Sequence, residues 1–318
     1  MTVGHSRWAP PAAMPSVAPR SGAGGSSSTG PILVASDGAS PSASAFIVAR
    51  LLAERLGAEV SVVSALEPSN VVVPPLDPLA APVRAGATRM EERRARLDLL
   101  ARSADDDAAR WPVEIVYGDR VPSMARLAME RGARLVVTGH THHGVLERFV
   151  QRETPLAIAR EARVPVLALP AAMTRLPRGV VVAVGLGDAA VRVSAVAGSL
   201  FGDAVAVHLV HVREPALPRH DRAMRQEEEA DDRSFEHAFD RARERWRLPA
   251  DVSAVTRVLV GKPADELRKF AQSVGADLLV VGLSIPGDAP HLPHRSLAAR
   301  LYREWPHALL LVPIGDAD

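Results

Sequence analysis

The segment from Thr138 to Thr154, TGHTHHGVLERFVQRET, contains several residues whose types could do chemistry. It follows a short apolar run, RLVV, and precedes a helix-like segment that leads into VPVLALP. A loop between a strand and a helix is a usual place for phosphate, because backbone amides and the helix N-terminus attract anions. In this segment, however, three histidines and the charged pair Arg152 and Glu153 stand where small residues would be expected.

A metal site is one interpretation of the histidines, because imidazoles at positions i and i+2, such as His140 and His142, can share one ion. Zinc normally takes four ligands, with thiolate or carboxylate completing the set, and the chain has no cysteine. The second half of the chain has LSIPG in place of this cluster. We therefore favour a solvated loop, which includes His143, and predict no metal site.

The composition of the chain narrows the classes of function. The formal net charge is +1 and aromatic residues make up 4% of the sequence, so we expect no nucleic-acid partner. No apolar run reaches the roughly 18 residues that span a bilayer, so no membrane association is expected. Residues 1–30 are rich in Pro, Gly and Ser and are predicted to form a disordered tail without a signal peptide. The expected location is cytoplasmic.

The chain also contains an internal repeat. The stretch YGDRVPSMARLAMERGARLVVTG from Tyr117 matches VGKPADELRKFAQSVGADLLVVG from Val260, at an offset of 143 residues. The front parts of the two copies match as well, with ILVASDGAS from Ile32 aligned to VVAVGLGDA from Val181, and ALEP aligned to HVREP. Only the middle segment differs in length, so the chain is interpreted as a duplicated domain.

Each copy alternates predicted strands and helices. The apolar runs predict these strands: Ile32–Ser36, Val60–Leu66, Val113–Tyr117, Leu135–Thr138, Val164–Leu169, Val180–Val184, Ala204–Val212, Ser253–Val260, Leu278–Val281 and Ala308–Val312. In the first copy, helical spacing predicts helices from about Ser42 to a cap at Gly57, over 87–104, from about Met124 to Gly132, and near Thr154–Arg163.

This alternation predicts the fold class. Strands that are apolar throughout need cover on both faces, and βαβ units supply that cover around a mainly parallel sheet. We predict an α/β protein with two tandem, open, doubly wound five-stranded sheets, in domains at residues 31–172 and 178–315. Such sheets bind ligands beyond the carboxyl ends of their strands.

These residues resemble the universal stress protein family. The resemblance rests on ILVASDGASPSASAFIVARLLAERLGAEVSVVSALEP, on the YGD and GKPADEL stretches, and on LVVTG and LLVVG followed by PVLALP and LLLVP. It covers about residues 31–170 and 178–313. It implies dimers formed through the last strand, so the two copies of a tandem chain are expected to pair as an intramolecular pseudo-dimer. Protein partners and further dimerisation are left open.

The resemblance also implies a nucleotide site, because many members of the family bind ATP through a G-x2-G-x9-G-[S/T] loop after the fourth strand. In the first copy this spacing falls on Gly139, His142, Arg152 and Glu153. In the second copy it falls on Gly282, Ile285, Arg295 and Ser296. Only the first glycine remains in both copies, and only the second copy keeps the hydroxyl. Gly144 and Gly287 are additional glycines nearby.

Several side chains in these loops are expected to oppose a triphosphate. Ile285 in a left-handed conformation would cost about 1–3 kcal/mol. The carboxylate of Glu153 at a helix N-terminus would satisfy the positive end of that helix and repel phosphate. Arg152 and Arg295 argue in the other direction, since a guanidinium can hold phosphate in a bidentate manner. The alternative is that each arginine pairs with a nearby carboxylate.

On the nucleoside side the two copies differ. Asp37 matches the family's aspartate after the first strand, next to Ala35, whereas Gly185 replaces it in the second copy. The base is expected to pack at the end of the second strand, on Ala65 and Val212. Asp37 is equally well explained as a turn residue, and Ser296 as a helix N-cap.

Three hypotheses follow. The first is a non-enzymatic stress-response module with degenerate nucleotide sites and no cofactor. The second is an adenine-nucleotide module that keeps an ATP site in one domain. The third is slow ATP hydrolysis, which needs a positioned base and usually a magnesium ligand. No catalytic residue is predicted, because the stretch His294–Ser296 has no partner that would complete a hydrolase triad.

Overall fold

The computed structural model describes residues 30–39, 42–67, 80–105, 110–140, 153–185, 188–202, 204, 206–214, 236–237, 239–241, 244, 254–285 and 296–315. The strands are β1 Ile32–Ala35, β2 Val60–Leu66, β3 Val113–Tyr117, β4 Leu135–His140, β5 Val166–Pro170, β6 Gly179–Ala183, β7 Ala206–Arg213, β8 Ala254–Val260, β9 Leu278–Ser284 and β10 Ala308–Ile314. The helices are α1 Ala43–Leu56, α2 Ala80–Ala104, α3 Arg120–Glu130, α4 Thr154–Ala162, α5 Asp188–Phe201, α7 Pro263–Ser273 and α8 Leu297–Glu304. Each predicted strand is present, with ends that differ by a few residues.

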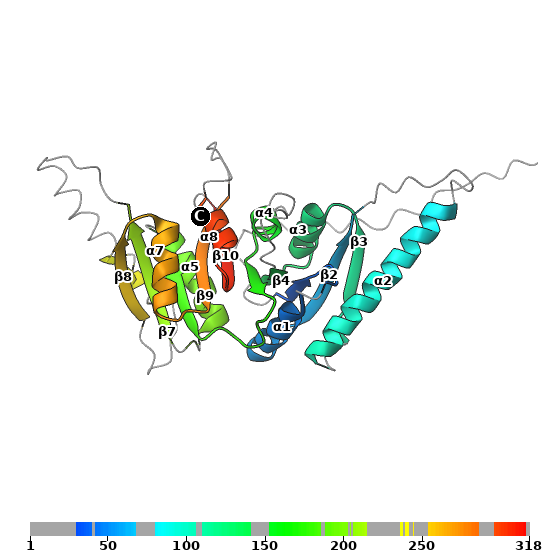
Figure 1. Cartoon of the computed structure of the whole chain (residues 1–318), viewed down its shortest axis with the longest axis horizontal. Coiled ribbons are helices and arrows are strands. Elements are labelled where there is room, and N and C mark those ends of the chain that lie inside the picture. The colour runs from blue at the N-terminus through cyan, green and yellow to red at the C-terminus, as the bar shows by residue number, and fades with distance from the viewer. Residues whose placement is uncertain are drawn as a thin grey trace, which may run out of the picture.

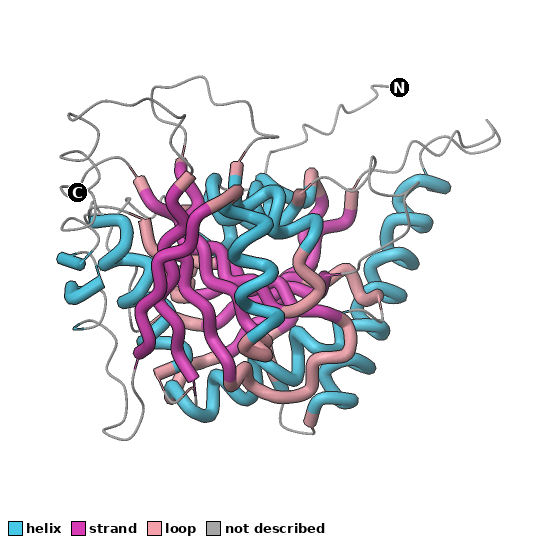
Figure 2. The backbone as a smooth tube through the Cα atoms, turned by 60° about the vertical axis from the view of Figure 1, so that its left-hand side comes forward, coloured by secondary structure: helices cyan, strands magenta, loops and turns pink. Residues whose placement is uncertain are grey.

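The strands form one ten-stranded sheet in the order β3-β2-β1-β4-β5-β10-β9-β6-β7-β8. Within each half of the chain the strands pair in parallel, in the doubly wound manner that the sequence predicts. Helices lie on both sides of this central layer (Figure 2). The predicted α/β fold class is therefore confirmed. The boundaries predicted for the domains stay predictions, and residues 1–29 of the predicted tail lie outside the described residues.

The two halves join through antiparallel pairing of β5 with β10, the last strand of each half. Leu167 lies opposite Leu310 in this ladder. Helices α4 and α8 lie near the junction on the same face of the sheet, and α4 contacts both β10 and β9 of the other half (Figure 1). The expected internal pairing of the two copies is present, and it merges two five-stranded sheets into one.

The sheet register corrects the alignment of the first strands by one residue. Ile32 pairs with Leu135, and Val180 pairs with Leu278, which is the repeat equivalent of Leu135 at the offset of 143. Ile32 therefore corresponds to Val180 and not to Val181. The run of consecutive valines from residue 180 hides this shift in the sequence. In the corrected alignment Gly185 is the repeat equivalent of Asp37.

Two apolar layers sandwich the sheet, and both run through the junction. One contains α1, α2 and α5, with inward residues such as Ile32 and Val34 of β1. The other contains α3, α4, α7 and α8, with the alternate residues Leu33 and Ala35. Because successive side chains of a strand point to opposite faces, a central strand must be apolar at every position. This requirement explains the continuous apolar runs in the sequence.

Turn chemistry also follows the sequence. Gly57 ends α1 in a left-handed conformation with φ of 59°, as predicted for a C-terminal cap.

Among the described residues, no helix is both long enough and apolar enough to cross a membrane.

The packing of the junction can be tested by truncating one of its buried side chains. Leu167 is fully buried opposite Leu310, so Leu167→Ala should lower the free energy of unfolding by about 2–5 kcal/mol. The matched control is Leu99→Ala, because 68% of Leu99 is exposed and its loss should cost less than about 0.5 kcal/mol. Urea denaturation monitored by far-ultraviolet circular dichroism measures both. Equal costs for the two variants would contradict the placement of Leu167 in the core.

Candidate functional site

Much of each predicted phosphate loop lies outside the described residues. This applies to His142, Gly144 and Arg152 in the first copy, and to Gly287 and Arg295 in the second. Most of the histidine cluster also lies outside the described residues. His143 is among those left out, and His140 is described only as the last residue of β4. The roles predicted for these side chains therefore stay predictions. The described ends of the loops, however, carry clear geometry.

Glu153 occupies the N-cap position of α4, and its side chain makes no capping hydrogen bond. Its carboxylate instead pairs with Arg303 of α8, with Nη1 at 2.5 Å from Oε1. We expected this carboxylate to interact with its own helix, whereas in the structure it pairs with a residue of the other half of the chain. Burial raises the pKa of the neighbouring Tyr302, and the charge of Glu153 raises it further.

Ser296 occupies the equivalent position at the start of α8. Its Oγ accepts a hydrogen bond of 3.1 Å from the amide of Ala299, which confirms the N-cap interpretation. The same oxygen lies 3.5 Å from Nη2 of Arg160, which belongs to α4 of the first half. Arg160 and Arg303 are repeat equivalents, so each half sends the same arginine to the N-cap of the other half's helix.

The first glycines of the two predicted phosphate loops belong to the sheet, and the side chain of Ile314 lies close to Gly282. Gly139 and Gly282 both lie within strands, opposite Leu169 and Val312 respectively. A Cβ atom built on Gly282 would come within 2.9 Å of Cδ1 of Ile314. Ile285, the last described residue before the loop, donates its amide to the carbonyl of Ile314 at 3.1 Å. The expected strain at Ile285 is absent, because Arg163 is the one non-glycine residue with positive φ in the described chain.

The nucleoside side of the first half is shaped by a turn. Asp37 Oδ1 accepts a hydrogen bond of 3.0 Å from the amide of Ala39, as expected of a turn aspartate. Ala35 and Ala65 are buried at the carboxyl ends of β1 and β2. The guanidinium of Arg93 reaches over this edge and donates to Ser64 Oγ at 2.9 Å. It also lies 3.5 Å from the carbonyl oxygen of Ala65.

The corresponding edge of the second half contains different side chains. Gly185 is exposed after β6, and Val212 is half-buried near the end of β7. His211 Nδ1 lies 2.8 Å from the carbonyl of Val184, so this strand histidine has a local hydrogen bond. Burial lowers the pKa of His208, whose ring packs edge-on against Phe270.

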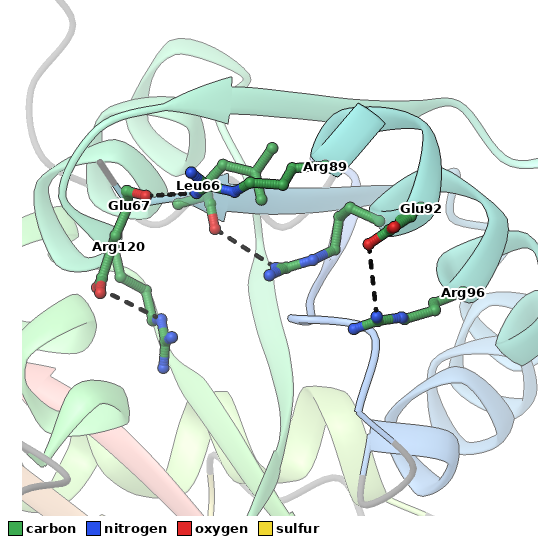
Figure 3. A pocket seen from close by; sticks show the side chains of 8 residues that line it. Leu66, Glu67, Arg89, Glu92, Arg96 and Arg120 are labelled. Atoms are coloured by element: carbon green, nitrogen blue, oxygen red, sulfur yellow. Dashed lines mark hydrogen bonds and ion pairs between the residues drawn. The ribbon is translucent and has the colours of Figure 1, made fainter. Parts of the chain in front are cut away.

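An open cleft beside Ala65 was not predicted from the sequence. It has a volume of about 280 Å³. We call it the arginine cleft, and its lining residues are Ala65, Leu66, Glu67, Arg89, Glu92, Arg93, Arg96 and Arg120. Arg96 and Arg120 extend into it from opposite sides (Figure 3). The available signal was the spacing of Arg89, Arg93 and Arg96 at i, i+4 and i+7, which places three cations on one helix face.

The arginines of the cleft raise one another's electrostatic energy. The pKa of Arg93 is lowered chiefly by burial, while Asp37 raises it. The positive charges of Arg120, Arg96 and Arg89 lower it further. Glu67 and Glu92 offset this repulsion only weakly, because their ion pairs with Arg120 and Arg96 are both 3.8 Å long. The cleft is therefore an electropositive environment.

Comparison with known proteins identifies the family of the chain. The model of the universal stress protein family matches residues 29–170 and again 178–313, which together make up most of the sequence. The chain belongs to the universal stress protein family. A search of curated proteins found no match.

Solved structures of universal stress proteins share the fold. One from Archaeoglobus fulgidus DSM 4304 is 14% identical, with a TM-score of 0.62, over 91% of this chain and 98% of that one. A putative universal stress protein from Pseudomonas aeruginosa UCBPP-PA14 is 12% identical, with a TM-score of 0.52, over 90% of this chain and 94% of that one. These matches span both halves, so the fold of the complete tandem unit is shared.

The contact between Glu153 and Arg303 can be measured by a double-mutant cycle with Glu153→Gln and Arg303→Gln. The two side chains are 24% and 40% exposed, so we expect a coupling free energy of about 0.5–1 kcal/mol that decreases at high salt. The control cycle uses Arg126 and Glu130, an exposed pair within α3 that should couple by about 0.3–0.5 kcal/mol. Zero coupling between Glu153 and Arg303 would refute the contact.

Proposed function

We propose that this universal stress protein is a non-enzymatic regulatory module of the cytoplasm, in which the two halves act as one unit through protein contacts. In this proposal the family's phosphate loops no longer accept a triphosphate. The position that carries the loop hydroxyl in nucleotide-binding members has become a contact between the halves.

The observation that carries this proposal is the pairing of Glu153 with Arg303. The carboxylate stands at the N-terminus of α4, where the family's loop would receive phosphate. A negative charge fixed there repels a second anion, and removing it from its partner would break an ion pair between the halves. Phosphate would have to displace a group that is already held in place by the fold.

The same geometry supports the absence of catalysis. Phosphoryl transfer needs a residue that orients water and usually a carboxylate that holds magnesium. Two carboxylates described near this edge in the first half are engaged in structural contacts. Asp37 closes its own turn, and Glu153 pairs with Arg303. Both would have to give up these contacts before they could serve a metal ion or a water molecule.

A thermal-shift titration with ATP and Mg²⁺ tests the proposal, with equal concentrations of tripolyphosphate as a control for charge alone. An intact site with a Kd of about 10 μM would add about 2.7 kcal/mol at 1 mM ligand and raise Tm by several degrees. We expect ATP to raise Tm no more than tripolyphosphate does. An increase in Tm of several degrees that ATP produces and tripolyphosphate does not would contradict the proposal for at least one half.

A second candidate function is adenine-nucleotide binding by the second half alone. One specific observation favours it: Ser296 keeps the hydroxyl, and the guanidinium of Arg160 lies 3.5 Å from it. A cation beside a helix N-terminus suits a phosphate group. In this alternative Arg160 supplies from the first half the donor groups that the missing glycines no longer provide.

Arg160→Gln tests this alternative in the same titration. If the second half binds ATP, the variant should lose the ATP-specific rise in Tm, because the phosphate loses its charged donor. Arg303→Gln is the matched control, since Arg303 is the repeat equivalent but faces Glu153, and it should keep the rise. Each variant is compared with its own ligand-free Tm. A rise that survives in Arg160→Gln would show that Arg160 does not bind the nucleotide.

A further inference from the structure

We propose that the arginine cleft of the first half binds a small phosphomonoester, with its phosphoryl group between Arg96 and Arg120. This site is separate from the family's glycine loop. Its cations come from α2 and from the first residue of α3, whereas the loop follows β4. The proposal is independent of whether either loop accepts ATP.

The position of the cleft favours a ligand. It lies at the carboxyl end of β2, where the buried residues Ala65 and Leu66 form its floor. Open parallel sheets bind ligands at this edge. A volume of about 280 Å³ lies at the lower end of the range of small-molecule sites, so the ligand would be as small as a sugar phosphate. A nucleic-acid strand would need an extended basic surface, and the whole chain has a net charge of only +1.

The charge of the cleft selects an anion. Four arginines and two glutamates line it, which leaves a formal excess of two positive charges, and Asp37 beside Arg93 offsets one of these. The cleft also lies at the start of α3, because Arg120 is the first residue of that helix. The positive end of the helix dipole therefore adds to the field. The anionic phosphoryl group of a phosphomonoester would offset this remaining positive charge.

The arginines of the cleft divide into anchored and available groups. Arg89 donates to the carbonyl of Glu67 at 2.7 Å, and Arg93 donates to Ser64 Oγ at 2.9 Å. Arg96 and Arg120 have ion pairs of 3.8 Å with Glu92 and Glu67, which is longer than a hydrogen bond. Their side chains are 61% and 44% exposed, so both forks can turn to a ligand.

The anchored contacts make the cleft rigid. Tyr117 Oη of β3 donates to the carbonyl of Gly86 at 2.6 Å, which fixes α2 at its N-terminal side. Together with the bonds of Arg89 and Arg93, this contact ties α2 to the ends of β2 and β3. A ligand would meet a cleft whose walls are already ordered, which lowers the entropic cost of binding.

Among the described residues of the second half, the position equivalent to Arg120 carries no cation. At the repeat offset of 143 residues, Arg120 corresponds to Pro263, which begins α7. A proline side chain cannot donate a hydrogen bond to phosphate. We therefore expect one phosphomonoester per chain.

Isothermal titration calorimetry on the full chain tests the proposal, with ribose 5-phosphate and inorganic phosphate as separate probes in a buffer free of phosphate. We expect ribose 5-phosphate to bind with a stoichiometry of one. Arg96→Gln/Arg120→Gln should weaken binding at least tenfold, because it removes two charge-assisted donors. Arg126→Gln, on the same helix as Arg120 but outside the cleft, should bind as wild type does.

A gain of function guards against loss through misfolding. Glu92→Gln removes the carboxylate that competes for Arg96, so it should tighten binding several-fold. Ser296→Ala, in the second-half loop, should leave ribose 5-phosphate binding unchanged, which separates this test from the ATP titration. Equal affinity for both probes would identify inorganic phosphate as the ligand class and overturn the organic ester. Absence of binding at 5 mM, or binding that the double arginine variant retains, would overturn the site itself.

Discussion

The antiparallel pairing of β5 with β10 is the contact on which the arrangement of the molecule depends. Each of these strands would otherwise be the open edge of a five-stranded sheet, with unpaired amides and carbonyls that invite association with another chain. The pairing satisfies both edges at once and continues both apolar layers across the junction. It also brings α4 and α8 close together, and that placement decides which side chains of one half reach the other.

Those cross-half contacts change the meaning of the loop positions. In a single domain, the residue at the start of the last helix faces solvent or a ligand. In this chain Arg303 reaches Glu153, and Arg160 reaches Ser296. The two contacts occupy equivalent positions but differ in kind, since one is an ion pair and the other a long hydrogen bond. The carboxylate at position 153 therefore forms an ion pair between the halves, at the position where our proposal has it oppose an anionic ligand.

The sequence was informative about everything that depends on periodicity. The repeat, the apolar runs and the glycine at residue 57 predicted the strands, the doubly wound order and a helix end, because these depend on local patterns. It was uninformative about contacts that depend on the placement of whole elements. Nothing near Glu153 in the sequence points to Arg303. Arg120 and Arg96 come together only because the start of α3 and the side of α2 both lie at the carboxyl end of β2. The valine run that begins at Val180 is uniform, so only pairing with β9 fixes its register.

The asymmetry between the halves has an electrostatic logic. In the first half, an acidic residue stands at the loop position and cations gather at the end of β2, and the proposed anion site accordingly lies near α2 and not after β4. The second half has the opposite arrangement, with a hydroxyl at the loop position and Pro263 where Arg120 would stand. A duplicated chain can hold both arrangements because the pairing of β5 with β10 involves neither edge residue. The backbone ladder between the halves is thus independent of these side chains, whereas the contact between α4 and α8 changes with them, because Glu153 pairs with Arg303.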